Sequence, residues 1–62
     1  MNPMIKMWLN DLYTTAIEES KTAIANERIW ANSGDDVDFH CGNIDTLEEY
    51  IEVLTKLKEE IN

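Results

Sequence analysis

Apolar residues recur along most of the chain at steps of three and four positions, the spacing of one face of an α-helix. Asn2 followed by Pro3 is a favourable helix start, and Gly34 is a favourable stop. The pattern therefore predicts a first helix from about residue 3 to residue 33. Its main apolar stripe consists of Ile5, Leu9, Leu12, Ala16, Ala23 and Trp30, with a shoulder of Tyr13, Ile17, Ile24 and Ala31.

A second helical pattern follows a short acidic turn, and it predicts a helix from about residue 36 to residue 61. Its stripe consists of Val37, His40, Ile44, Leu47, Ile51, Leu54 and Ile61, with Tyr50 and Leu57 on the flank. Asp35, Asp36 and Asp38 are candidates for the N-cap. An alternative start lies near Asp45, where two overlapping segments resemble capping boxes. We prefer the earlier start, because the apolar period already includes His40.

Two amphipathic helices with a short turn between them pack antiparallel, so we expect an all-α fold, with residues 1–62 forming a single helical-hairpin domain. A chain of 62 residues with one cysteine, Cys41, and no zinc ligand set has neither a disulfide nor a metal to support its small core. Each apolar stripe is wide enough to touch more than one neighbour. We therefore expect a homo-oligomeric helix bundle, a dimer or higher, of which a dimeric four-helix bundle is the simplest form.

The formal net charge of −8, from thirteen acidic and five basic residues, repels duplex DNA and anionic membranes. The N-terminal MNPMIKMWL is too short for a membrane span and lacks the features of a signal peptide. We expect a cytoplasmic protein that binds neither membranes nor nucleic acid directly. The same surface suits a basic protein partner or the mimicry of nucleic acid.

The turn is where residues with binding chemistry gather. In an antiparallel hairpin, Asn26, Glu27 and Trp30 must come level with His40 and Asn43. In a structural interpretation, His40 and Asn43 hydrogen-bond the last carbonyls of the first helix, Glu27 orients His40 and Trp30 covers them. In a functional interpretation, the same groups line a small polar and aromatic pocket that suits a base or a sugar.

Catalysis and metal binding fit the sequence poorly. His40 and Cys41 are adjacent, so on a helix they point about 100° apart, and no oxyanion donor is evident. Asp36, Asp38 and His40 resemble the first ligands of a calcium loop. However, Cys41 and Leu47 occupy the positions that an EF-hand gives to glycine and glutamate. We expect no enzyme activity, no metal and no cofactor.

The segment from Asn26 to Gly34 reads NE-x-IWA-x-S-G, and after an acidic stretch the segment from His40 to Ile51 reads H-x-x-NI-x-x-L-x-x-YI. This pattern resembles small helical-hairpin proteins of phages and prophages of Gram-positive bacteria. The resemblance covers roughly the C-terminal two-thirds of the chain. It implies a helical hairpin, and the group has no settled activity.

The Trp30-Ala31 step near a helix end is also similar to the hairpins of phage sponge proteins, which sequester cyclic-nucleotide or cyclic-ADP-ribose immune signals as compact helical oligomers. This chain departs from them in its acidity and in lacking a basic cluster for the ligand's phosphates. The resemblance implies an anti-defence protein of the host cytoplasm that sequesters a small nucleotide signal. Its ligand-binding residues would be Asn26, Glu27, Trp30, His40 and Asn43, with Lys21 or Arg28 at the phosphate.

The alternative function is that of an acidic protein-interaction inhibitor, or DNA mimic, which blocks a host defence protein. Its candidate contacts are Glu18, Asp35, Asp36, Asp38, Glu48, Glu49 and Glu52. An accessory role in virion assembly is a third, purely structural option.

Overall fold

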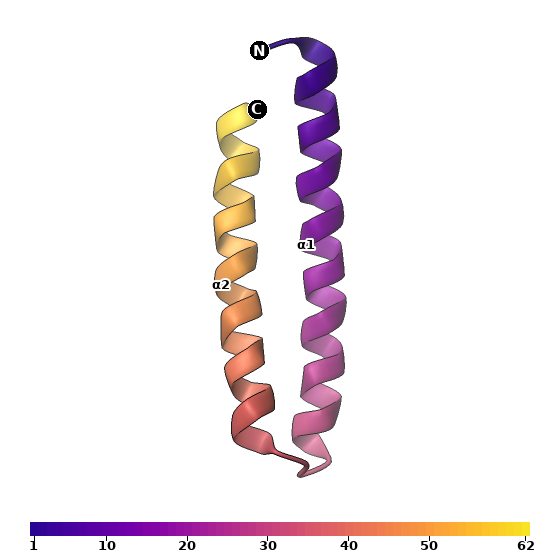
Figure 1. The fold of residues 1–62 in the computed structure, drawn as a ribbon, viewed down its shortest axis with the longest axis vertical. Coiled ribbons are helices and arrows are strands. Elements are labelled where there is room, and N and C mark those ends of the chain that lie inside the picture. The colour runs from indigo at the N-terminus through magenta and orange to yellow at the C-terminus, as the bar shows by residue number, and fades with distance from the viewer.

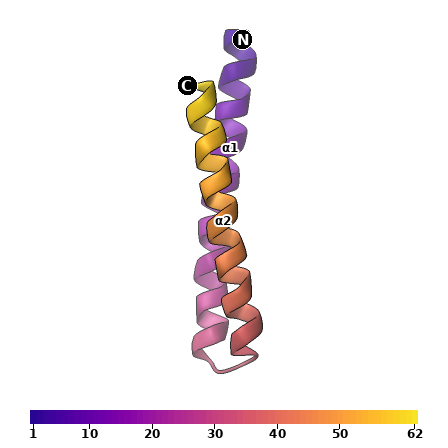
Figure 2. The same cartoon turned by 90° about the vertical axis from the view of Figure 1, so that its left-hand side faces the viewer.

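The computed structural model describes all residues from 1 to 62 and contains two helices, α1 (Pro3–Asn32) and α2 (Val37–Ile61). The helices lie side by side and antiparallel, with both termini at one end and the turn at the other (Figure 1). Seen from the side, they run at a shallow angle to one another (Figure 2). The Cα atoms span 48 × 14 × 10 Å, so the hairpin is a rod. The predicted all-α hairpin is confirmed. Neither helix combines the length and the apolar character that crossing a membrane requires.

Local signals place both ends of α1 within one residue of the prediction. The Asn2 side chain accepts a hydrogen bond from the Met4 backbone N–H at 2.8 Å, and Pro3 occupies the first turn. At the other end, the Gly34 N–H donates to the Ala31 carbonyl at 3.1 Å. Gly34 has φ of 82°, a left-handed conformation that glycine adopts without a steric penalty. The start and stop signals of α1 are confirmed.

The second helix begins at Val37, so the alternative start near Asp45 is wrong. Asp36 precedes it in the left-handed conformation, with φ of 47° and ψ of 59°. A residue that caps a helix with its side chain usually has an extended backbone, and the Asp36 side chain makes no capping hydrogen bond. Asp36, one of the three candidates, is therefore the N-cap residue, but its side chain does not cap α2. Asp38 still places a negative charge in the first turn, where the helix dipole favours it.

The two helices contact along one line of each, which we call the hairpin seam. Its residues recur at alternating steps of three and four, the repeat of coiled-coil packing. Each is buried or half-buried in the hairpin, and Ile24 and Leu54 are its most buried apolar residues. The seam consists of Asn10, Tyr13, Ile17, Ser20, Ile24, Glu27 and Ala31 in α1, and of His40, Ile44, Leu47, Ile51, Leu54, Lys58 and Ile61 in α2.

The seam of α1 is the predicted shoulder rather than the predicted stripe. Ile17 and Ile24 are covered by α2, whereas Ile5, Leu12 and Trp30 remain exposed. Two adjacent apolar lines run along α1, and a single neighbouring helix covers only one of them. The wide stripe read from the sequence is therefore divided between a packed line and an exposed one.

Polar side chains thin the middle of the seam. Ser20 is buried, and its hydroxyl donates to the Ala16 carbonyl at 2.7 Å within the same helix. This internal bond satisfies the hydroxyl without a partner from α2. The Thr14 hydroxyl is buried with no hydrogen-bond partner. Ser20 in the seam and Thr14 beside it contribute little apolar burial, so Ile24 and Leu54 are the buried apolar residues of the contact between the helices.

The division between packed and exposed lines predicts different effects for the same substitution in one helix. Ile24 is 7 % exposed and Ile29 is 66 % exposed. We expect Ile24→Ala to lower the free energy of unfolding by about 2–4 kcal/mol through lost burial and a residual cavity. Ile29→Ala, the matched control, should change it by less than about 0.5 kcal/mol. Urea denaturation followed by circular dichroism measures both, and equal losses would contradict the described seam.

Candidate functional site at the tip of the hairpin

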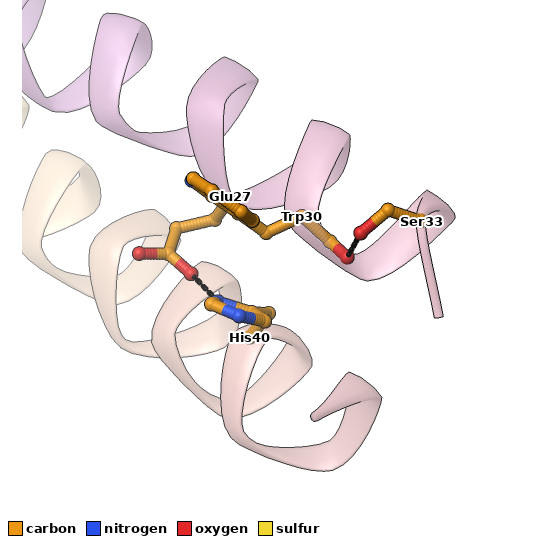
Figure 3. A network of polar contacts seen from close by, with 4 residues as sticks. All are labelled: Glu27, Trp30, Ser33 and His40. Atoms are coloured by element: carbon orange, nitrogen blue, oxygen red, sulfur yellow. Dashed lines mark hydrogen bonds and ion pairs between the residues drawn. The ribbon is translucent and has the colours of Figure 1, made fainter. Parts of the chain in front are cut away.

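Glu27 of α1 and His40 of α2 form a hydrogen bond across the seam near the turn. It joins Glu27 Oε2 to His40 Nδ1 (Figure 3). The His40 side chain is 13 % exposed and that of Glu27 is 24 % exposed. A carboxylate removed from water is costly without a partner, and the imidazole supplies one. Of the two interpretations of the tip, the structural one includes this contact between Glu27 and His40.

Two aromatic rings also contact the imidazole of His40. The Trp30 ring is stacked with it at 6.2 Å between centroids and 19° between planes. The Phe39 ring meets it edge-on, at 5.3 Å and 70°. Such contacts restrict the orientation of the imidazole beyond what the hydrogen bond does. Trp30 and Phe39 are themselves more than half exposed, so the tip presents an aromatic surface to solvent.

Phe39 is a member of this cluster that the sequence analysis missed. It lies off the predicted stripe of α2, and helical periodicity does not indicate contact between adjacent residues. The sequence feature that could have identified Phe39 is its position next to His40, because Phe, Trp and Tyr together make up only five residues of the chain.

The end of α1 is capped from within its own chain segment. The Ser33 hydroxyl donates to the Trp30 carbonyl at 2.7 Å, as Figure 3 shows, and the Ser33 N–H donates to the carbonyls of Ile29 and Trp30. His40 and Asn43 are therefore not the caps of α1, as the structural interpretation had them. Ser33, directly after the helix, already donates hydrogen bonds to these carbonyls, so the imidazole does not cap α1.

The two predicted amides lie near the cluster but outside its hydrogen bonds. Asn26 is exposed on α1, directly before Glu27. Asn43 is half-buried on α2, one helical turn beyond His40. Both amides keep their hydrogen-bonding capacity for solvent or for a bound molecule.

The two predicted phosphate contacts lie away from the aromatic surface. Lys21 and Arg28 are exposed on one flank of α1. Arg28 is two residues before Trp30, so the two side chains point about 200° apart around the helix. Arg28 also contacts Glu48 of α2, at 3.6 Å. Within one copy, the structure brings Glu27, Trp30 and His40 into contact and separates the basic residues from them.

The hairpin has a surface at its tip rather than a cavity. No pocket is hollowed into the molecule, and no three acidic, histidine or cysteine side chains converge as metal ligands would. Cys41 carries an exposed free thiol. The tip of a single copy therefore offers ring faces and amides for surface contact.

No protein-family model, curated protein or solved structure matches this chain. The similarity to phage hairpins therefore stays a prediction. The function of this chain has to be inferred from the arrangement of its residues.

The tip contains a semi-buried pair and a surface pair between the same two helices, which allows a controlled comparison. Arg28 and Glu48 are 62 % and 54 % exposed, and such pairs contribute less than about 1 kcal/mol. We expect a double-mutant cycle on Glu27→Ala and His40→Ala to give a coupling energy of roughly 1–3 kcal/mol. The same cycle on Arg28→Ala and Glu48→Ala should give a clearly smaller value. Thermal unfolding supplies both energies, and a coupling near zero for the first pair would contradict its structural role.

Proposed function

We propose that this chain is a homo-oligomeric binding protein without catalytic activity, which occupies a basic surface of a protein partner. The observation that carries the proposal is a line of exposed carboxylates along the side of α2 that faces away from α1. We call this line the acidic stripe; it consists of Asp38, Asp45, Glu49, Glu52 and Glu59.

One basic residue, Lys56, lies on the same line between Glu52 and Glu59, and no stripe carboxylate forms an ion pair within the chain. Of the thirteen acidic residues, all except Glu27 are exposed, and Glu27 and Glu48 are the two that contact a basic side chain. The remaining negative charge is available to steer a positively charged partner and to form charge-assisted contacts with it.

The charge density favours a basic groove of a protein over a channel shaped for duplex DNA. A net charge of −8 along a 48 Å rod is one charge per 6 Å, whereas B-DNA carries one charge per about 1.7 Å. A close mimic of DNA would need a denser line of carboxylates. The resemblance to phage hairpins makes a host defence protein the partner that we propose.

Neutralising the acidic stripe should weaken this binding more than an equal change of charge elsewhere. The double variant Asp45→Asn/Glu49→Gln and its matched control Asp11→Asn/Glu18→Gln each remove one exposed Asp and one exposed Glu. In a pull-down from bacterial lysate with stepwise salt elution, we expect the stripe variant to bind its basic partner roughly tenfold more weakly. The α1 control should retain the partner. Equal retention by the two variants, or no salt-sensitive partner at all, would contradict the proposal.

A second candidate function, sequestration of a small nucleotide signal, is favoured by one observation. The exposed Trp30 ring lies over His40, with Phe39 beside it and the amide of Asn26 nearby in sequence, so the tip offers an aromatic surface of the kind on which a base stacks. An assembly of several copies would have to bring Lys21 or Arg28 to the ligand's phosphate.

This second candidate predicts that ligand binding depends on one of the two tryptophans. Calorimetric titration of cyclic nucleotides and cyclic ADP-ribose isomers should give binding that Trp30→Leu abolishes. Trp8→Leu is the matched control, because Trp8 has a similar exposure at the opposite end of α1. The loss of stacking corresponds to about 1–3 kcal/mol. The absence of binding across the whole panel would remove this candidate.

A further inference from the structure

The exposed apolar residues of the two helices are arranged in a regular way. Thirteen large apolar side chains are more than one-third exposed, and seven of them stand directly before a residue of the hairpin seam or before Lys6, which continues the seam by one step of four. We call the surface of these seven the open face. It consists of Ile5, Leu12 and Trp30 in α1, and of Phe39, Tyr50, Val53 and Leu57 in α2.

A position directly before a seam residue is rotated by about 100° from it around the helix. The rotation has the same sense in α1 and α2 relative to each helix's own direction. Because the helices are antiparallel and face each other, equal rotations of this kind point to the same side of the hairpin. The exposed apolar lines of α1 and α2 therefore form one continuous face.

An observed contact supports this geometry. Arg28 and Glu48 stand directly after the seam residues Glu27 and Leu47, and their side chains approach within 3.6 Å. Positions after the seam thus share one side of the hairpin. Positions before the seam share the opposite side, which is the open face.

The open face is almost free of charge on a chain with eighteen charged residues. Leu9 and small or polar residues continue its two lines at steps of three and four, and the charged residues on these lines are Glu19 and Glu60. These further positions are Leu9, Ala16, Glu19, Ala23 and Asn26 in α1, and Asn43, Thr46 and Glu60 in α2. The face therefore has the repeat of a helix-packing surface, with the acidic stripe on another side of α2.

One copy leaves an unusually large surface in water. Its accessible surface is 4627 Å², compared with about 4,100 Å² for a compact monomer of this mass, and only three residues are buried. The backbone outline of the open face measures 48 by 14 Å. Two such faces together cover on the order of 1,300 Å², within the range of about 1,200–2,000 Å² for specific stable interfaces.

We infer that the open face is where a second copy of this chain packs, giving a four-helix bundle with two-fold symmetry. A second copy presents the same helical lines, which carry few charges, as an interface between identical faces requires. It also leaves the acidic stripe of both copies in solvent, where their mutual repulsion is screened. An anionic membrane would be repelled by the net charge, and a basic partner has the acidic stripe to bind.

This arrangement specifies the self-association in the proposed function and is independent of what the acidic stripe binds. It also places Trp30, one of the two tryptophans, under the second copy. Trp30 stacks with His40, so dimerisation covers the aromatic side of the tip. A nucleotide would then have to bind beside the interface or compete with it.

The inference is tested by sedimentation equilibrium of the whole chain and of two matched variants. Leu12→Glu introduces a charge on the open face, and Ile29→Glu introduces the same charge in the same helix on another side. The two side chains are similarly exposed in one copy, at 62 % and 66 %. We expect a dimer for the unaltered chain, a dissociation constant raised at least about 100-fold by Leu12→Glu, and a change of less than threefold for Ile29→Glu.

A second readout on the unaltered chain covers the case in which Leu12→Glu fails to fold. Tryptophan emission should shift to shorter wavelength, and the melting temperature should rise, as the concentration increases through the dimer range. Val53→Glu tests the same face from α2 and should abolish both trends. A monomer at all concentrations, or equal weakening by Leu12→Glu and Ile29→Glu, would overturn the inference. Because sedimentation needs no partner, its failure is distinguishable from failure of the lysate pull-down.

Discussion

Burial along a single line of each helix is the constraint on which the rest of this structure depends. Two helices side by side cover one stripe of each other, and here the stripe is interrupted by small and polar residues. Ile24 and Leu54 are its buried apolar residues, and the Ser20 hydroxyl donates a hydrogen bond to a carbonyl of its own helix. The chain is therefore rich in helix-forming signals and poor in buried apolar surface. Long helices that bury little apolar surface leave apolar residues exposed along their length. This exposed surface is the reason that we infer a second copy.

The hydrogen bond between Glu27 and His40 gives the seam a specific register at the turn. Both residues occupy positions that apolar side chains would otherwise fill, and sliding one helix by a turn would leave each without its partner. Polar pairs of this kind contribute less to stability than to the choice of one alignment among several, a role best documented in coiled coils. The stacked Trp30 and the edge-on Phe39 reinforce that alignment from outside the seam.

The sides of the rod have separate chemistry. The open face carries most of the large exposed apolar residues and two charges, those of Glu19 and Glu60. The acidic stripe faces away from α1, and Arg28 and Glu48 contact each other on the side opposite the open face. The proposed self-association and the proposed recognition of a basic partner use different surfaces, so the two proposals are compatible. Trp30 and Phe39 of the tip belong to the open face, at its end near the turn. Ligand binding at the tip would therefore be coupled to assembly.

The sequence by itself determined what depends on near neighbours along the chain. The period of apolar residues, Asn2 with Pro3, and Gly34 located the helices to within one residue, and the antiparallel hairpin brought Glu27 level with His40. Tertiary structure decided which of two adjacent apolar lines of α1 packs and which residues surround the imidazole. Lys21 and Arg28 were correctly assigned to one flank, yet their separation from Trp30 became apparent only in the folded chain. The physical reason is that caps and periodicity act within a few residues, whereas the choice between neighbouring faces depends on the shape and register of the opposing helix.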